Sequence, residues 1–113
     1  MSISKDLVAA SAIPMILSIL SEGNSYGYAI IKRVHQLSSG QLQWTDGMLY
    51  PVLHRLEKQG LIQSRWEVSK QGRSRKYYQI KKQGTEKLNV QKAQWQLVNS
   101  ALNQLWEKKT CLT

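Results

Sequence analysis

The fold is decided by the stretch TDGMLYPVLHRLEKQG (residues 45–60) and by the stretch LIQSRWEVSKQGRSRKYYQI (residues 61–80) that follows it. In the first, apolar residues recur every three or four positions, as on one face of a helix, and Thr45 is a favourable N-cap. In the second, polar and apolar residues alternate on either side of a glycine-containing turn. We therefore expect a helix over residues 46–59, followed by a β-hairpin with strands at residues 61–68 and 75–80.

Two further helices are predicted before this stretch. Ser4 can cap a helix that runs to about residue 21, although Pro14 lacks the N–H that this helix would use and should kink or restart it. A turn at residues 22–24 precedes a second helix over about residues 25–37. Pro51 lies inside the third helix in the same way and should bend it or loosen its first turn.

The last predicted element is a helix over residues 85–107, which Thr85 could cap and which contains neither glycine nor proline. Its apolar residues repeat every seven positions, and its length of roughly 35 Å exceeds what a small domain needs to cover its own core. A helical arm that packs against a second subunit is the simplest use of such a helix. The residues expected in this interface are Leu88, Trp95, Val98, Leu102 and Leu105.

Positive charge is concentrated in one part of the chain. The 113 residues carry a net charge of +9, and nine basic against two acidic residues between positions 61 and 92 account for +7 of it. A concentrated block of this kind attracts an anionic polymer, whereas evenly spread lysines only favour solubility. Nucleic acid is therefore a candidate partner, with an ordinary solvated face as the alternative.

Several classes of protein are disfavoured. The longest apolar run, residues 13–20, is much shorter than a membrane span of about 20 apolar residues, and a secretory leader also fits poorly. Cys111 is the single cysteine, which is compatible with a reducing cytoplasm. His35 and His54 have no further ligands at metal-binding spacing, and no phosphate loop or nucleophile–base pair is present. We therefore expect a cytoplasmic protein without membrane contact, metal, cofactor or enzymatic activity.

Three helices followed by a basic hairpin are the layout of a winged helix-turn-helix, a mainly α fold with a small β-hairpin (α+β). Its third helix is narrow enough for the DNA major groove, and the hairpin, or wing, offers cations to the flanking phosphates or minor groove. Specific motifs sharpen this interpretation. They are YGYAII (26–31), DGMLYPVLHRLE (46–57), GLI (60–62), Trp66, GRSRKYY (72–78) and Gly84.

Through these motifs the chain resembles the PadR family of bacterial transcriptional regulators over about residues 13–106. One departure is Lys81, where the family usually has threonine. The resemblance implies a dimeric repressor that binds a pseudo-palindromic operator, with one winged module per half-site and an interface made by the C-terminal helices. We divide the chain into a DNA-binding domain (residues 1–83), a dimerisation helix (84–107) and a tail (108–113).

The side chains expected to contact double-stranded DNA lie on the third helix and on the wing. Thr45 stands at the helix N-terminus, where capping is its first expected role, and Tyr50 projects from the face opposite the leucines. Wing cations suit phosphate or minor-groove contacts. The full set is Thr45, Tyr50, His54 and Arg55 on the helix, and Lys70, Arg73, Arg75 and Lys76 on the wing.

Tryptophans have two expected uses. Trp44 and Trp66 are expected to be packing residues. Trp95 and Trp106 are expected in the dimer core, although a flat indole such as Trp95 could also stack on a small aromatic effector. Two other functions remain open: an architectural protein that binds nucleic acid without sequence preference, and an interaction module that uses the C-terminal helix on a different protein.

Overall fold

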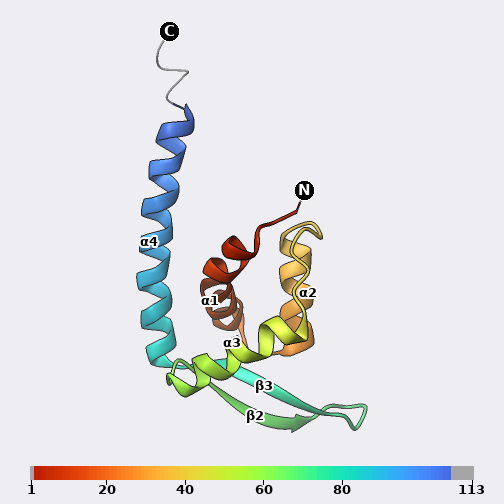
Figure 1. Ribbon diagram of the computed structural model, residues 1–113. Helices are drawn as coiled ribbons and strands as arrows, with labels where there is room; N and C mark the ends of the chain where they lie inside the picture. Colours follow the sequence, from red (N-terminus) through yellow and green to blue (C-terminus); the bar gives the residue numbers. More distant parts are fainter. Residues whose placement is uncertain (1, 108–113) are drawn as a thin grey trace.

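The computed structural model describes residues 2–107, so the expected tail at residues 108–113, with Cys111, lies outside the described part of the chain. Within that part, four helices and a small sheet confirm the expected winged helix-turn-helix (Figure 1). The elements are α1 (Lys5–Glu22), β1 (Ser25–Tyr26), α2 (Gly27–Leu37), α3 (Asp46–Lys58), β2 (Ile62–Val68), β3 (Ser74–Ile80) and α4 (Lys82–Glu107).

The hairpin of β2 and β3 is extended by β1 into a three-stranded antiparallel sheet of order β1-β3-β2. Ser25 pairs with Tyr78 and Tyr26 pairs with Tyr77, so the chain just before α2 is fastened to the wing. The expectation of a helix from Ser25 was wrong, since α2 begins at Gly27. Two residues are too few to show the period of a strand, and the pairing with β3 decides their conformation.

The hydrophobic core lies between α1, α2, α3 and the base of the hairpin, and it also includes one residue of α4. Each helix contributes one apolar face, as its spacing of leucine, isoleucine and valine predicts. The largest fully buried side chains are Ile16, Leu17, Leu20, Ile30, Val34, Leu49, Leu53, Leu56, Ile62 and Leu88.

Both prolines lie inside continuous helices. Pro14 is within α1, so the expected restart there was wrong. The first turn of α3 is also intact, because the Leu49 N–H donates to the Thr45 carbonyl at 2.9 Å, and the expectation that Pro51 would loosen it was wrong. A proline removes one hydrogen bond, whereas the burial of the apolar face on both sides of it stabilises the whole helix.

Helix α4 begins at Lys82, three residues before its expected start. The Thr85 N–H donates to the Lys81 carbonyl at 3.0 Å, so Thr85 is inside the first turns and is not the cap. Gly84 lies inside the first turn of α4. A side chain at Gly84 would overlap the carbonyl oxygen of Leu61, which explains a glycine at this position.

Two elements project from the domain (Figure 1). The hairpin extends to one side, and α4 rises from its base and runs past the other three helices. Because β2 continues beyond the core, Trp66 is 69% exposed, and the expectation that it packs was wrong; Trp44 is buried as expected. None of the helices in the described residues is long and apolar enough to cross a lipid bilayer.

Candidate nucleic-acid interface

Helix α3 buries one face and exposes the other. Its leucines at positions 49, 53 and 56 are fully buried and anchor it to the core. Outside this face, Tyr50 and His54 present a phenol and an imidazole one helical turn apart. The predicted contact residues Thr45, Tyr50, His54 and Arg55 are all exposed.

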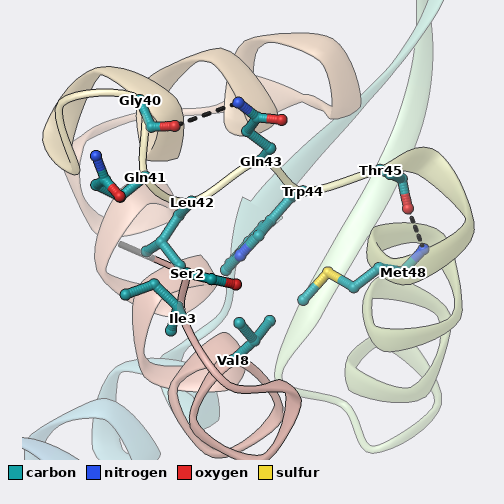
Figure 2. Close-up of a pocket in the computed structure, with 10 residues that line it drawn as sticks. All are labelled: Ser2, Ile3, Val8, Gly40, Gln41, Leu42, Gln43, Trp44, Thr45 and Met48. Carbon is teal, nitrogen blue, oxygen red and sulfur yellow. Dashed lines mark hydrogen bonds between the residues drawn. The ribbon is translucent and has the colours of Figure 1, made fainter.

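The segment that leads into α3 is fixed by side chain–backbone hydrogen bonds. Ser38 Oγ accepts the Leu42 N–H at 2.8 Å, and Thr45 Oγ1 accepts the Met48 N–H at 3.2 Å, which confirms the expected N-cap. Figure 2 shows the Thr45 bond and the indole of Trp44, which reaches from this segment toward the N-terminal residues of the chain. These contacts fix the direction in which α3 leaves the turn.

The side chain of Tyr50 extends from α3 and contacts Gly27, the first residue of α2. A side chain at Gly27 would overlap the Tyr50 hydroxyl, and its Cβ would lie 2.7 Å from Tyr50 Cζ. Gly27 is buried, whereas Tyr50 remains 42% exposed. The phenol therefore rests on bare backbone of α2, and the rest of its surface is available to a ligand.

The tip of the wing is a tight turn that displays two cations. Gly72 has φ +82°, where glycine is favoured, and its N–H donates to the Ser69 carbonyl at 2.9 Å. The Ser69 N–H donates in turn to the Arg73 carbonyl at 2.7 Å. Lys70 and Arg73 are exposed and form no ion pair within residues 2–107, so their charges are available to an anion.

Arg75 is held against an aromatic ring. Its guanidinium carbon lies 4.5 Å from the ring centroid of Tyr26, the β1 residue that pairs with β3. Tyr26 makes an edge contact with Tyr77, with ring centroids 5.3 Å apart. A cation over a ring contributes about 0.5–1 kcal/mol at an exposed site, so Arg75 is oriented without being neutralised.

Glu57 connects the end of α3 to both long strands. It accepts a hydrogen bond from the Ser64 hydroxyl of β2 at 2.5 Å, and its Oε1 lies 3.9 Å from Lys76 Nζ of β3. The ammonium of Lys76 is also 5.7 Å from the ring centroid of Tyr78. These contacts set the angle between the wing and α3, and they partly neutralise Lys76 before any ligand binds.

The wing, the start of α2 and the exposed face of α3 enclose one groove of about 740 Å³. Its lining is aromatic and cationic and contains no acidic side chain. The groove brings Tyr50 of α3 together with Arg73, Arg75 and Lys76 of the wing, which the sequence predicted as separate sets. His54, Arg55, Thr45 and Lys70 lie outside this lining.

One tyrosine of the groove has a shifted pKa. Burial raises the pKa of Tyr78 above its usual range, and the neighbouring Tyr50 and Glu57 raise it further. Tyr78 is therefore a neutral residue of the groove at physiological pH. Among the described residues, no group of three or more histidine, cysteine or acidic side chains could hold a metal ion.

The residues expected in the dimer interface fall into two groups. Leu88 is 2% exposed and packs in the core of the single chain, so it is not available to a second subunit. This removes Leu88 from the predicted interface, because the start of α4 already packs against α1. The remaining members, all at least partly exposed along α4, are Trp95, Val98, Leu102 and Leu105, with Trp106 beside them.

Sequence reasoning missed several residues of the groove. Tyr26 and Tyr28 line the groove but were placed only within a family motif, and the same is true of Glu57, which lies outside the lining and contacts Lys76. The alternation in β2 could have indicated that Trp66 is exposed, because it continues beyond the part of the strand that the core covers. No such pattern marks Tyr26 or Glu57, since their roles depend on contacts with distant segments.

A family model described as the transcriptional regulator PadR-like family matches residues 16–90. The chain belongs to this family. Two solved structures of transcriptional regulators are similar to this chain over almost their whole length. A transcriptional regulator from Clostridium thermocellum is 30% identical, covers 88% of this chain and 97% of its own, and has a TM-score of 0.80. A PadR-like transcriptional regulator from Bacillus cereus is 29% identical, with coverages of 91% and 98% and a TM-score of 0.81.

A curated relative matches a shorter stretch. The transcriptional regulator YqjI of Escherichia coli is 42% identical over 53 residues, which are 47% of this PadR-family chain. The same stretch is 26% of YqjI, so this relative is much longer than the region it shares with the chain.

Proposed function

We propose that this PadR-family protein binds double-stranded DNA as a homodimer and represses transcription from a pseudo-palindromic operator. The observation that carries the proposal is the groove, in which the exposed face of α3 and the cations of the wing share one side of the domain. A cationic and aromatic lining without acidic side chains suits a DNA backbone. The transcriptional regulators among the similar proteins support the same class of function, which would place the protein in the cytoplasm.

In this proposal α3 enters the major groove. An α-helix with its side chains is about 10–12 Å across, which matches a major groove about 12 Å wide. Tyr50 and His54 contact base edges, because both are exposed and lie one helical turn apart on the same side of α3. Thr45 and Arg55, at the two flanks of the same helix, contact the backbone and position the helix.

The wing neutralises phosphates beside each half-site. Within residues 2–107, Lys70 and Arg73 at the tip form no ion pair, and the guanidinium of Arg75 lies over the ring of Tyr26. Each phosphate contact lowers the slope of log affinity against log salt by about 0.9. Lys76 contributes less than the other three, since Glu57 already shares its charge.

The homodimer is proposed from α4. After Leu88 the apolar residues of this helix are exposed, although their seven-residue spacing is typical of a helix that packs against another helix. A second copy of the chain would bury Trp95, Val98, Leu102 and Leu105. Two-fold symmetry then sets the half-sites about 34 Å apart, or a multiple of that distance, along the DNA.

A small aromatic effector is a narrower proposal for the same helix. In the single chain Trp95 is 39% exposed, so its indole face is available to an effector wherever the second copy leaves it uncovered. A flat compound stacked there would alter the angle between the two winged modules and hence their spacing. An aromatic compound that releases the wild type from DNA and has no effect on a Trp95→Leu variant would support this role. Equal release of both proteins would contradict it.

The decisive experiment is a footprint on the region upstream of the protein's own gene, with random duplex as competitor at moderate salt. We expect a discrete protected site with inverted symmetry. Protection without sequence preference would instead support the architectural alternative. A monomer at micromolar concentration in sedimentation would contradict the homodimer and favour a different protein partner for α4.

Variants separate the two contact surfaces. Arg73→Ala should weaken binding to every sequence and flatten the salt dependence, because it removes a phosphate contact. His54→Ala should change the ratio between cognate and random sites. Lys92→Ala removes an exposed charge on α4, outside the groove, and serves as the matched control with an unchanged salt slope.

A further inference from the structure

The apolar face of the wing is longer than the core that it covers. In the β2–β3 ladder, Ile62 faces Ile80, Ser64 faces Tyr78 and Trp66 faces Lys76, so these side chains share one side of the sheet. At the base of the hairpin this side is buried, with Ile62 1% exposed. Four residues further along, on the same side, Trp66 is 69% exposed. The alternation thus presents a tryptophan that residues 2–107 leave mostly uncovered.

Exposure of so large a ring needs an explanation, because each exposed aromatic side chain forgoes the stabilisation of burial. Trp66 lines the groove described above, opposite Tyr28 and Tyr50, which are also exposed. Lys76 is the cross-strand partner of Trp66, Arg73 belongs to the same lining, and no acidic side chain is present there. The partner that fits this surface is therefore anionic and also has flat or apolar faces.

We propose that Trp66 is a direct DNA contact, which packs against the deoxyribose rings and base edges of the minor groove beside each half-site. This inference rests on the proposed DNA-binding function and assigns to Trp66 a role in it. When α3 occupies the major groove, the wing on the same side of the domain meets the adjoining backbone and minor groove. The cations engage phosphates, and the indole covers the apolar sugars between them.

A duplex is favoured over other anionic partners by the position of Trp66 relative to α3. The indole and Tyr50 line the same groove, so a ligand seated on one also reaches the other. Minor-groove proteins often use an apolar side chain together with arginine or lysine, which is the combination that Trp66 of β2 makes with Lys76 of β3. A second copy of the chain would instead meet the cations with its own net positive charge.

The first test compares variants by fluorescence anisotropy with a labelled random duplex and with the footprinted site. Trp66→Ala should weaken binding to duplex about tenfold, and Trp66→Phe should restore most of the affinity because it retains an aromatic ring. The salt slope should not change in Trp66→Ala, since no phosphate contact is removed, whereas Arg73→Ala should reduce it. Gln63→Ala, on the opposite face of the same strand and also exposed, is the matched control.

The second test observes the indole itself. Protein labelled with 5-fluorotryptophan gives one ¹⁹F resonance for each of the four tryptophans, and the Trp66→Phe variant assigns the resonance of Trp66. On addition of duplex we expect this resonance to shift and to lose its H₂O/D₂O isotope effect, because DNA excludes solvent from the ring. Thermal unfolding of Trp66→Ala should be close to that of the wild type, which separates a lost contact from a lost fold.

The outcomes distinguish this inference from the proposed function. Duplex binding with an unchanged Trp66 resonance would overturn the role of Trp66 and leave DNA binding intact. A Trp66 resonance that is already protected from solvent in the unliganded protein would overturn it in favour of a second copy on the wing. Tighter, Trp66-dependent binding of a single strand of the same length would overturn the duplex contact. Absence of duplex binding would remove the proposed function and this inference together.

Discussion

Gly84 provides the sharpest test of how α4 is joined to the winged domain. A Cβ at this position would overlap the Leu61 carbonyl oxygen and lie 2.8 Å from Ile80 Cγ1. Carbon–carbon contacts settle at about 3.5–4.0 Å, so roughly 1 Å must open between α4 and the base of the hairpin. The Leu61 carbonyl cannot move easily, because it accepts the Lys81 N–H at 2.9 Å at the start of the same helix.

The expected cost of Gly84→Ala follows from these contacts. Overpacking costs about 1–3 kcal/mol, and a weakened backbone hydrogen bond costs about 1 kcal/mol more. Alanine returns about 0.5–1 kcal/mol of helix propensity. The free energy of unfolding should therefore fall by about 1–3 kcal/mol, which corresponds to roughly 4–12 °C in Tm for a domain of this size.

Gly47→Ala is the matched control, since Gly47 also lies in the first turn of a helix. The nearest atom to its added Cβ is Thr45 Oγ1 at 4.0 Å, so the propensity gain of about 0.5–1 kcal/mol should appear without a steric cost. The assay is urea and thermal unfolding at one fixed protein concentration. A Gly84→Ala variant as stable as the wild type would refute the reasoning, and so would a destabilised Gly47→Ala variant.

Three further predictions concern the groove. Glu57→Gln keeps an acceptor for the β2 hydroxyl but releases Lys76, so affinity for any duplex should rise about two- to fivefold in anisotropy titrations; unchanged affinity would mean that Lys76 does not contact DNA. Gly27→Ala would displace the Tyr50 ring and should lower the ratio of cognate to random binding in gel shifts. An unchanged ratio would contradict a role of Tyr50 in sequence preference. The raised pKa of Tyr78 means that the folded chain holds this proton more tightly than the unfolded chain. The contribution of this hydroxyl to the free energy of unfolding is therefore complete below the unfolded pKa of about 10. It is lost as the pH rises through the pKa of Tyr78 in the folded chain. Unfolding measured between neutral and alkaline pH should show a smaller loss of stability in Tyr78→Phe than in the wild type, and equal losses would contradict this assignment.

The order of helices and hairpin was predictable because each element carries a local period. Leucines at helical spacing and the change to alternation at Leu61 depend on residues close in the chain, and both were confirmed. The short strand β1 was missed, because two residues have no period and only their pairing with β3 defines them. Leu88 was assigned to a partner interface, since a heptad pattern does not reveal which chain covers a given position.

Trp66 also shows that a local pattern does not reveal whether a side chain is covered. Its alternation with polar neighbours correctly indicated a strand, and an aromatic residue in a strand is usually covered. Whether it is covered depends on how far the hairpin extends past the core, which is a property of the assembled domain. The exposed indole became evident only once the position of β2 relative to α1, α2 and α3 was known.

The sequence by itself determined the fold class, the family and the location of the charge, because these follow from local spacing, motifs and counting. Only the tertiary structure decided which cations remain available. Among residues 2–107, Lys70 and Arg73 at the tip form no ion pair, Arg75 lies over the ring of Tyr26, and Lys76 is 3.9 Å from Glu57. These differences arise from contacts between segments far apart in the chain. Electrostatic and ring contacts act over a few ångströms, so their partners are fixed only when the chain has folded.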